Sequence, residues 1–134
     1  MFLLDTNVVS ELRRPRPHGA VLDWIGDVPA EQLFVSAVTV GEVQAGIEIT
    51  REQDAAKAEE LEDWLGKVIT SYGVLPMDAA AFREWARLMH RRSDTLSEDA
   101  MIAATAVVHR LTVVTRNVSD FSRLGVDSQN PFEM

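Results

Sequence analysis

Short apolar runs alternate along the chain with longer stretches whose apolar positions recur at helical spacing. The runs that predict strands are residues 2–4, 33–35, 74–76 and 111–114, and a short edge strand is expected after residue 125. No hairpin-type turn joins consecutive runs, so helices are expected to carry the chain from one strand to the next. The pattern therefore predicts an α/β fold with a short, mostly parallel sheet flanked by helices.

Polar residues suggest where several of the helices begin. Thr39 and Glu42 have the spacing of a capping box, so one helix is expected to begin near Val40. The run 101–108 is almost entirely apolar or small, which indicates a helix packed on several sides. The other expected helices are residues 8–12, 18–25, 51–72, 78–92 and 97–109, the third stopped by Gly73 and the last two capped by Asp78 and Ser97.

Composition narrows the class of protein. With 134 residues, 46% of them hydrophobic, residues 1–134 are expected to form a single globular domain. The absence of cysteine excludes disulfide scaffolds, zinc ribbons and thiol nucleophiles. The chain starts with only a few apolar residues and no basic leader, and no later run approaches a membrane span. We therefore expect a cytoplasmic protein without a membrane segment.

The charge balance leaves the partner open. A net charge of -8, from 21 acidic and 13 basic residues, argues at first against nucleic acid. However, basic residues cluster in residues 13–16 and again in 87–92, so local positive patches can coexist with a negative total. Carboxylates that hold divalent cations also reverse the local sign of the charge.

Four acidic side chains are candidates for a metal site. Asp5 ends the first predicted strand and Asp120 follows the fourth, while Glu42 and Asp99 each lie in the first turn of a predicted helix. Ligands of open α/β sheets bind beyond the carboxyl ends of the strands, so the four could converge there. Carboxylates without histidine or cysteine are suited to Mg²⁺ or Mn²⁺.

Each of these acids also has an ordinary structural explanation. Glu42 completes the possible capping box, Asp99 suits a helix N-terminus, and Asp120 can cap a turn. Asp5 is harder to explain in this way, because a carboxylate directly after a buried strand is costly unless it is paired or metal-bound. Helical spacing does not separate Asp99 from its neighbour Glu98, since both lie above small or apolar residues one turn later.

Four segments of the chain resemble those of PIN-domain proteins, specifically the VapC-like toxins of bacterial toxin-antitoxin modules and their FitB-like branch. The matching segments are LLDTNVVSEL at 3–12, SAVTVGEVQAGI at 36–47, EDAMIAATAVVH at 98–109 and LTVVTRNVSDF at 111–121. The resemblance implies a three-layer fold, a Mg²⁺ or Mn²⁺ site, and endonucleolytic cleavage of RNA by metal-activated water. It also implies inhibition by a cognate antitoxin.

The family's acidic positions fall on Asp5, Glu42 and Asp99, which by resemblance favours Asp99 over Glu98. Many relatives carry an acid directly after the Thr-Arg pair, where this chain has Asn117 and its nearest acid is Asp120. Either Asn117 positions a water while Asp120 supplies charge, or a second metal is weakly held. The resemblance further implies hydrogen bonds from Thr6 and Thr115 to the carboxylates or to bound water, and phosphate contacts from Arg13, Arg14, Arg16 and Arg116.

Two other functions compete with this hypothesis. A phosphatase of the haloacid dehalogenase type also places an Asp after its first strand, but it needs a second Asp where this chain has Asn7, and its required lysine has only Lys57 and Lys67 as candidates. A non-catalytic module could bind Mg²⁺ with the same carboxylates and turn nothing over. Loss of metal-dependent RNA cleavage in Asp5→Ala would separate an enzyme from such a module.

Apolar residues on two helices predict a homodimer. The helix 51–72 and the helix 78–92 carry more apolar surface than a thin sheet of short strands needs. The residues concerned are Trp64, Leu65, Val68, Trp85, Leu88 and Met89.

Overall fold

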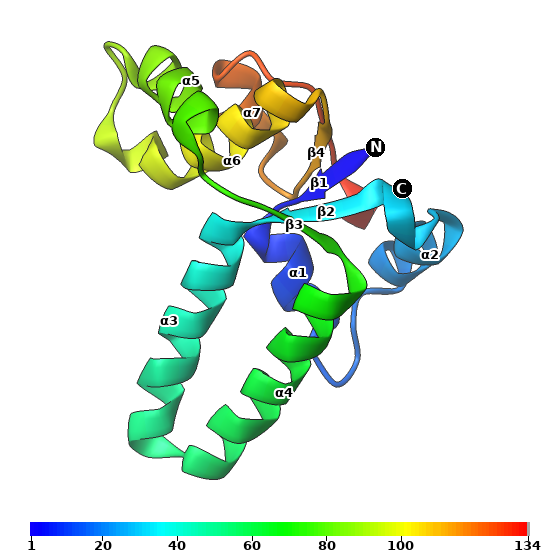
Figure 1. Ribbon diagram of the computed structural model, residues 1–134. Coiled ribbons are helices and arrows are strands. Elements are labelled where there is room, and N and C mark those ends of the chain that lie inside the picture. Colours follow the sequence, from blue (N-terminus) through cyan, green and yellow to red (C-terminus); the bar gives the residue numbers. More distant parts are fainter. Residues whose placement is uncertain (134) are drawn as a thin grey trace.

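The computed structural model describes residues 1–133, which are built around a five-stranded, fully parallel sheet of order β3-β2-β1-β4-β5. The strands are β1 (Phe2–Leu4), β2 (Leu33–Ser36), β3 (Gly73–Leu75), β4 (Thr112–Val114) and β5 (Ser128–Gln129). The helices are α1 (Thr6–Leu12), α2 (Gly19–Asp27), α3 (Ala37–Gln53), α4 (Ala55–Ser71), α5 (Ala79–Met89), α6 (Ser97–His109) and α7 (Val118–Arg123). The predicted α/β class and parallel sheet are confirmed (Figure 1).

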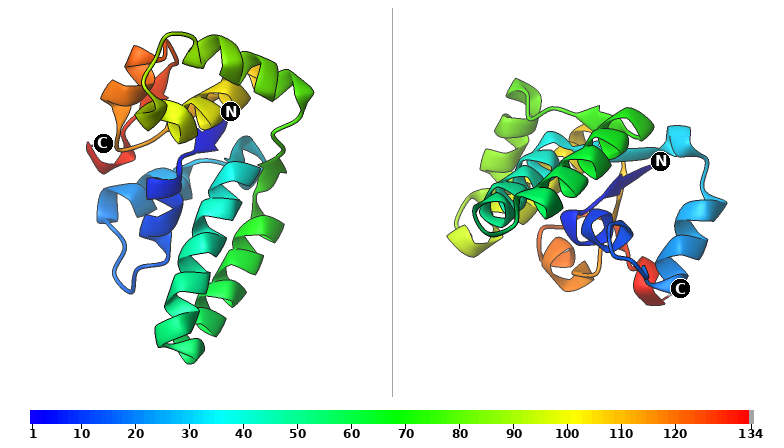
Figure 2. Two further views of the ribbon diagram at one scale, coloured as in Figure 1. Left: turned by 90° about the vertical axis from the view of Figure 1, so that its left-hand side faces the viewer. Right: turned by 90° about the horizontal axis from the view of Figure 1, so that it is seen from below.

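Alternate residues of the strands divide the molecule into three layers. Leu3 and Val113 point to one face, where they pack with buried residues of α6 and α7. Leu4 and Val114 point to the other face, where they pack with buried residues of α1, α2 and α4. The left-hand view of Figure 2 shows the two groups of helices on opposite sides of the strands. Both faces are therefore covered, as is usual for parallel sheets.

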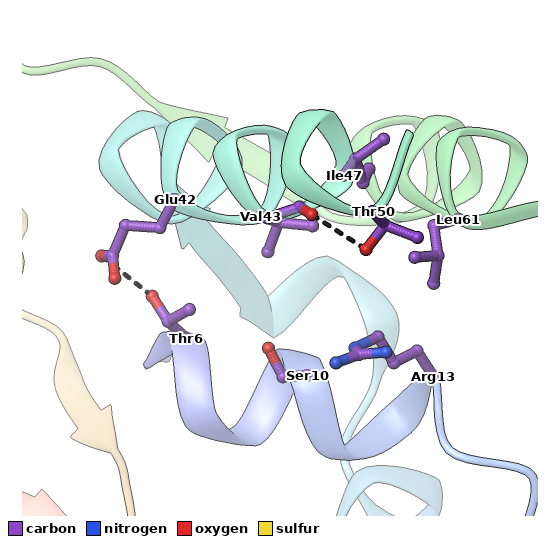
Figure 3. A pocket seen from close by; sticks show the side chains of 9 residues that line it. Thr6, Ser10, Arg13, Glu42, Val43, Ile47, Thr50 and Leu61 are labelled. Atoms are coloured by element: carbon purple, nitrogen blue, oxygen red, sulfur yellow. Dashed lines mark hydrogen bonds between the residues drawn. The ribbon is translucent and has the colours of Figure 1, made fainter. Parts of the chain in front are cut away.

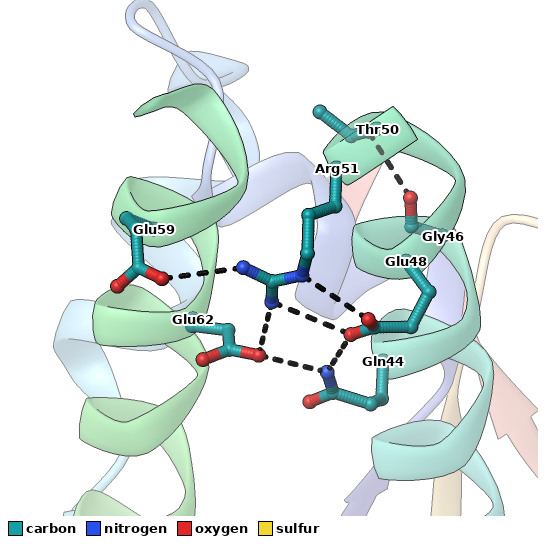
Figure 4. A network of polar contacts seen from close by, with 7 residues as sticks. All are labelled: Gln44, Gly46, Glu48, Thr50, Arg51, Glu59 and Glu62. Carbon is teal, nitrogen blue, oxygen red and sulfur yellow. Dashed lines mark hydrogen bonds and ion pairs between the residues drawn. The ribbon is translucent and has the colours of Figure 1, made fainter. Parts of the chain in front are cut away.

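Helices α3 and α4 form a long antiparallel hairpin that extends away from the sheet (Figure 1). The expectation of one helix over 51–72 was wrong, because the chain leaves helical geometry at Asp54 (φ -153°, ψ 90°), whose Oδ1 then accepts a hydrogen bond from Lys57 N at 3.0 Å. Near this end, the Arg51 guanidinium binds carboxylates of both helices, Glu48 on α3 and Glu59 and Glu62 on α4 (Figure 4). This network joins the two helices across their polar faces.

Two of the predicted helix caps were wrong. Helix α3 begins at Ala37 with Ser36 as its cap, whose Oγ accepts a hydrogen bond from Val38 N at 3.0 Å. Thr39 and Glu42 are therefore inside the helix and do not form a capping box. Helix α6 begins at Ser97 itself, and no side chain caps it. The predicted cap at Asp78 is confirmed, although α5 ends at Met89 rather than near residue 92.

The residues predicted to form a dimer interface mostly fill the protein's own core. Leu65 and Val68 are buried between α4 and the rest of the chain, and Trp85 packs beside α6 and donates its indole N–H to Ser97 O at 3.1 Å. Much of the expected surplus of apolar surface is therefore used within the chain itself, and the dimer stays a prediction. On α5 the exposed aromatic residue is Phe82, whose side chain is 45% exposed.

Within residues 1–133, no helix is both long enough and apolar enough to cross a membrane.

Candidate metal centre

Asp5 is held at the carboxyl end of the central strand β1, where it also caps α1. Its side chain is only 3% exposed. Oδ1 accepts a hydrogen bond from Thr6 N at 2.8 Å, and Oδ2 accepts bonds from Thr115 Oγ1 at 2.7 Å and Asn7 Nδ2 at 3.2 Å. Burial raises the pKa of Asp5, and the three hydrogen bonds oppose that rise. Donors from both ends of the chain thus fix this carboxylate in place.

Glu42 lies opposite Asp5 across the side chain of Thr6. Thr6 Oγ1 donates a hydrogen bond to Glu42 Oε1 at 3.1 Å and also lies 3.0 Å from Thr39 Oγ1. Burial, and after it the charge of Glu98, raises the pKa of Glu42 to about 7. Both causes favour the protonated form of Glu42, because burial removes water from the charged carboxylate and Glu98 repels it.

Asp99, in the first turn of α6, belongs to the same acidic group. Burial, and after it the charges of Asp5, Asp120 and Glu98, raise the pKa of Asp99 to about 6. The charge of Asp120, on α7, helps to raise the pKa of both Asp5 and Asp99, so Asp120 lies near both carboxylates. The structure thus brings all four predicted acids together. It also adds Glu98, which acts on Glu42.

These side chains surround an open hollow of about 290 Å³ at the carboxyl ends of the strands. Its lining residues are Asp5, Thr6, Asn7, Glu42, Asp99 and Asn117. Asp120 is not part of the lining and reaches the site through Asp99. Asn117 is part of the lining, and its backbone N–H donates to Thr115 Oγ1 at 2.9 Å.

The donor set fits a hard divalent cation, since it consists of carboxylate, hydroxyl and amide oxygens around an open space. Within residues 1–133, however, no three acidic or histidine side chains are already close enough to hold one metal ion together. Carboxylates that repel each other stand apart until a cation draws them in, so a modest side-chain movement is needed for binding. The same repulsion contributes, after burial, to the raised pKa values of Glu42 and Asp99.

Two residues of the site were missed by reasoning from the sequence. Asn7 donates to Asp5 Oδ2 and to Thr115 Oγ1 (3.3 Å), and its Oδ1 accepts the Arg116 backbone N–H at 3.1 Å. Thr39 is fully buried beside Thr6. The available signal was Asn7 itself, a polar residue in the first turn of a helix that the candidate ligand Asp5 caps.

The four arginines expected to contact phosphates lie in different environments. Arg13 lines a groove between α1 and α3 (Figure 3). Arg14 pairs with the buried Glu11 at 3.3 Å, and Arg16 is exposed in the following loop. Arg116 stacks its guanidinium on the Phe132 ring at 3.7 Å.

Comparison with known proteins identifies the family. The model for the PIN domain matches residues 2–126. The VapC ribonuclease Y4jK of Sinorhizobium fredii is 38% identical over 99% of both chains. A crystal structure of FitAcB from Neisseria gonorrhoeae superposes with a TM-score of 0.89 at 31% identity, covering 100% of both chains, and a toxin-antitoxin complex from Klebsiella pneumoniae has a TM-score of 0.75 at 26% identity, also covering 100% of both chains.

Proposed function

Because this chain belongs to the PIN-domain family, we propose that it is a Mg²⁺- or Mn²⁺-dependent endoribonuclease and the toxin of a toxin-antitoxin module. The observation that carries the proposal is the acidic group at the carboxyl ends of parallel strands, where Asp5, Glu42 and Asp99 line one open hollow and Asp120 lies beside Asp99. Asp120 pairs with Arg123 at 3.7 Å, whereas Asp5, Glu42 and Asp99 form no ion pair with a basic side chain within residues 1–133. A site with three such carboxylates is suited to a cation. The ribonuclease among its relatives supports the reaction class.

In this proposal Asp5, Glu42 and Asp99 are the metal ligands, and Asp120 adds negative charge from behind Asp99. When bound, the cation lowers the pKa of the attacking water and balances negative charge that develops on the scissile phosphate. Thr115 holds Asp5 through the 2.7 Å hydrogen bond, and Thr6 holds Glu42 through the 3.1 Å bond. Fixed ligand orientation of this kind preserves metal affinity. Asn117 lines the hollow, where its amide can position a water.

The arginines would bind the RNA backbone. Arg13, Arg14 and Arg16 follow directly from α1, the helix that Asp5 caps, and Arg116 follows Thr115 at the end of β4. Cations at the margin of an acidic site can bind phosphates on either side of the cleaved bond. This arrangement offers a route by which a chain of net charge -8 binds a polyanion.

We further propose a cognate antitoxin as partner, a homodimer as the assembly and the cytoplasm as the location. The toxin-antitoxin complex among the related structures supports the partner. An antitoxin that presents an arginine to the hollow would pair with its carboxylates and exclude the cation. Antitoxin and cation would then compete for the same site, because both are attracted by its negative charge.

Two observations disfavour the phosphatase alternative. Asn7 occupies the position where that enzyme needs its second Asp, and its amide N–H groups donate to Asp5 and Thr115. Neither Lys57 nor Lys67 lines the hollow, and Lys57 pairs with Glu60 on the exposed side of α4. A non-catalytic Mg²⁺-binding module remains the alternative that the experiment has to exclude.

The experiment is cleavage of total RNA, then of a defined oligonucleotide, with Mg²⁺ or Mn²⁺ and with EDTA. We expect cleavage that leaves 5′-phosphate and 3′-hydroxyl ends, requires the cation and is lost in Asp99→Asn. Glu98→Gln is the matched control at the adjacent position, and it should retain cleavage. Metal binding without cleavage would favour the non-catalytic module, and a cyclic phosphate end would contradict metal-activated water.

A further inference from the structure

A second cavity adjoins the acidic hollow and is not explained by metal binding. It is a groove of about 210 Å³ between α1 and α3, closed on one side by Leu61 of α4 (Figure 3). Thr6 and Glu42 line both the groove and the hollow, so the two adjoin at this hydrogen-bonded pair. Whatever occupies the groove therefore lies directly beside the carboxylates.

The groove has an apolar side and a polar side. From α3 and α4 it receives the aliphatic side chains of Val43 and Leu61, and Ile47 lies behind them in the core. From α1 it receives Ser10 and Arg13, which lie on the same helix face as Thr6 because their spacing is four and seven residues. An occupant with flat apolar faces and polar edges matches these walls.

Arg13 supplies the positive charge of the groove. The ion pairs formed by arginines among residues 1–133 involve Arg14, Arg51, Arg87 and Arg123, whereas Arg13 has no acidic partner within that part of the chain. A guanidinium in this position is available to an anionic group of the occupant, such as a phosphate.

We propose that the groove is a nucleotide subsite, in which the base next to the scissile phosphate packs on Val43 and Leu61 while Arg13 binds a backbone phosphate. This inference rests on the proposed ribonuclease function. A polymer whose phosphate reaches the carboxylates must place its neighbouring nucleotide nearby, and the groove opens at that point. Burial of a base in such a groove would give the enzyme a preference for certain bases at that position.

Gly46 offers a way to fill the groove without disturbing the fold. It lines the groove from the middle of α3, and a Cβ added there would meet no atom within 4 Å. Gly66 is a matched control on α4, because its added Cβ also meets nothing within 4 Å. The two glycines also have the same local hydrogen bond. The Gly46 carbonyl accepts from Thr50 Oγ1 and the Gly66 carbonyl accepts from Thr70 Oγ1, both at 3.1 Å.

The experiment compares Gly46→Ala, Gly46→Leu and Gly66→Leu with the wild type. Initial rates are measured with Mn²⁺ on a short RNA randomised around its cleavage site. In parallel, NMR spectra of the Val43 and Ile47 methyl groups are recorded with a non-cleavable oligonucleotide. We expect Gly46→Leu to raise KM at least tenfold and to lose base preference at one position, with Gly46→Ala intermediate and Gly66→Leu unchanged. The oligonucleotide should shift both methyl signals in the wild type and not in Gly46→Leu.

The outcomes separate this inference from the proposed function. Cleavage with equal KM and equal base preference in all variants would overturn the subsite and leave the nuclease in place. Absence of cleavage together with shifted methyl signals would overturn the nuclease and support the subsite. Absence of both would overturn the two together. If Gly46→Leu cleaves like the wild type but escapes inhibition by the antitoxin, the groove binds a peptide and the nucleotide subsite is wrong.

Discussion

Removing one negative charge from the acidic site should stabilise the metal-free protein. The variant is Asp99→Asn, which nearly preserves the volume of the side chain. The pKa of Asp99 is raised from 3.8 to about 6, mainly by burial and by the charges of Asp5 and Asp120. Two pKa units set a ceiling of about 3 kcal/mol on the cost of ionising Asp99 in the folded protein. Because the side chain is partly exposed, solvent screening reduces the expected gain to about 1 kcal/mol.

The dependence on pH follows from the direction of the shift. A carboxyl whose folded pKa is raised contributes stability that is fully present below its unfolded pKa of 3.8 and is lost as pH rises through about 6. Asparagine does not ionise, so the Asp99→Asn variant does not lose this stability as the pH rises. Its advantage over the wild type should therefore be absent at pH 4, grow between pH 4 and 6, and stay constant above pH 7.

The assay is thermal unfolding in EDTA at pH 5 and pH 8, with Asp63→Asn as the control for an exposed helix carboxylate. A gain of about 1 kcal/mol corresponds to an increase in melting temperature of about 3–5 °C for a chain of this size. Excess Mn²⁺ should remove the advantage, because the wild type then binds the cation more tightly. A variant no more stable than the wild type at pH 8 in EDTA would refute the reasoning.

Further predictions concern the metal, the neighbouring acid, the sheet and the assembly. Mn²⁺ should raise the melting temperature of the wild type, and less so that of Asp5→Asn; a wild-type curve that ignores millimolar Mn²⁺ would argue against convergent ligands. In Glu98→Gln the acid limb of the pH–rate profile should move to lower pH, because the charge of Glu98 raises the pKa of Glu42; an unmoved limb would contradict this coupling. Gly73→Ala should destabilise the fold by about 1–3 kcal/mol in urea unfolding, since its Cβ would lie 2.5 Å from the Phe34 ring; full stability would mean that the ring moves freely. Light scattering should show a dimer that Phe82→Glu weakens, and a monomeric wild type at micromolar concentration would refute it.

The fold was predictable where local pattern and global packing agree. The strands β1, β2 and β4 are mostly buried apolar runs, and β3 is a more exposed run at the edge of the sheet; all four lie within a residue or so of their predicted positions. The break at Asp54 was not predictable from periodicity, because Arg51 on one side and Ala55 on the other both suit helices. The chain turns there because Asp54 caps α4 and because Arg51 binds acids of the returning helix, which is a tertiary contact.

The residues of the candidate site were predictable from the sequence, but the contacts between their side chains were not. The end of a parallel strand located Asp5, and the resemblance selected Glu42 and Asp99. Helical spacing could not separate Asp99 from Glu98, and the structure explains why: both side chains act on the acidic group, Asp99 from the lining of the hollow and Glu98 through Glu42. The contact between Thr6 and Thr39 depends on how α1 packs on α3, which no local pattern reports.

The central position of β1 has a consequence for the time at which activity can arise during synthesis. Asp5 is made among the first residues, yet its backbone N–H bonds to Val114 O at 2.9 Å and its carboxylate to Thr115, 110 residues later. A nascent chain shorter than about 115 residues cannot pair β1 with β4, so its first carboxylate has neither its strand neighbour nor its hydroxyl partner. Contacts between such distant residues also form slowly, because the intervening chain must be ordered first. Under the proposed function, a fragment that ends before β4 would therefore lack the fixed carboxylate that the cation needs, and activity would have to wait until β4 has closed onto β1.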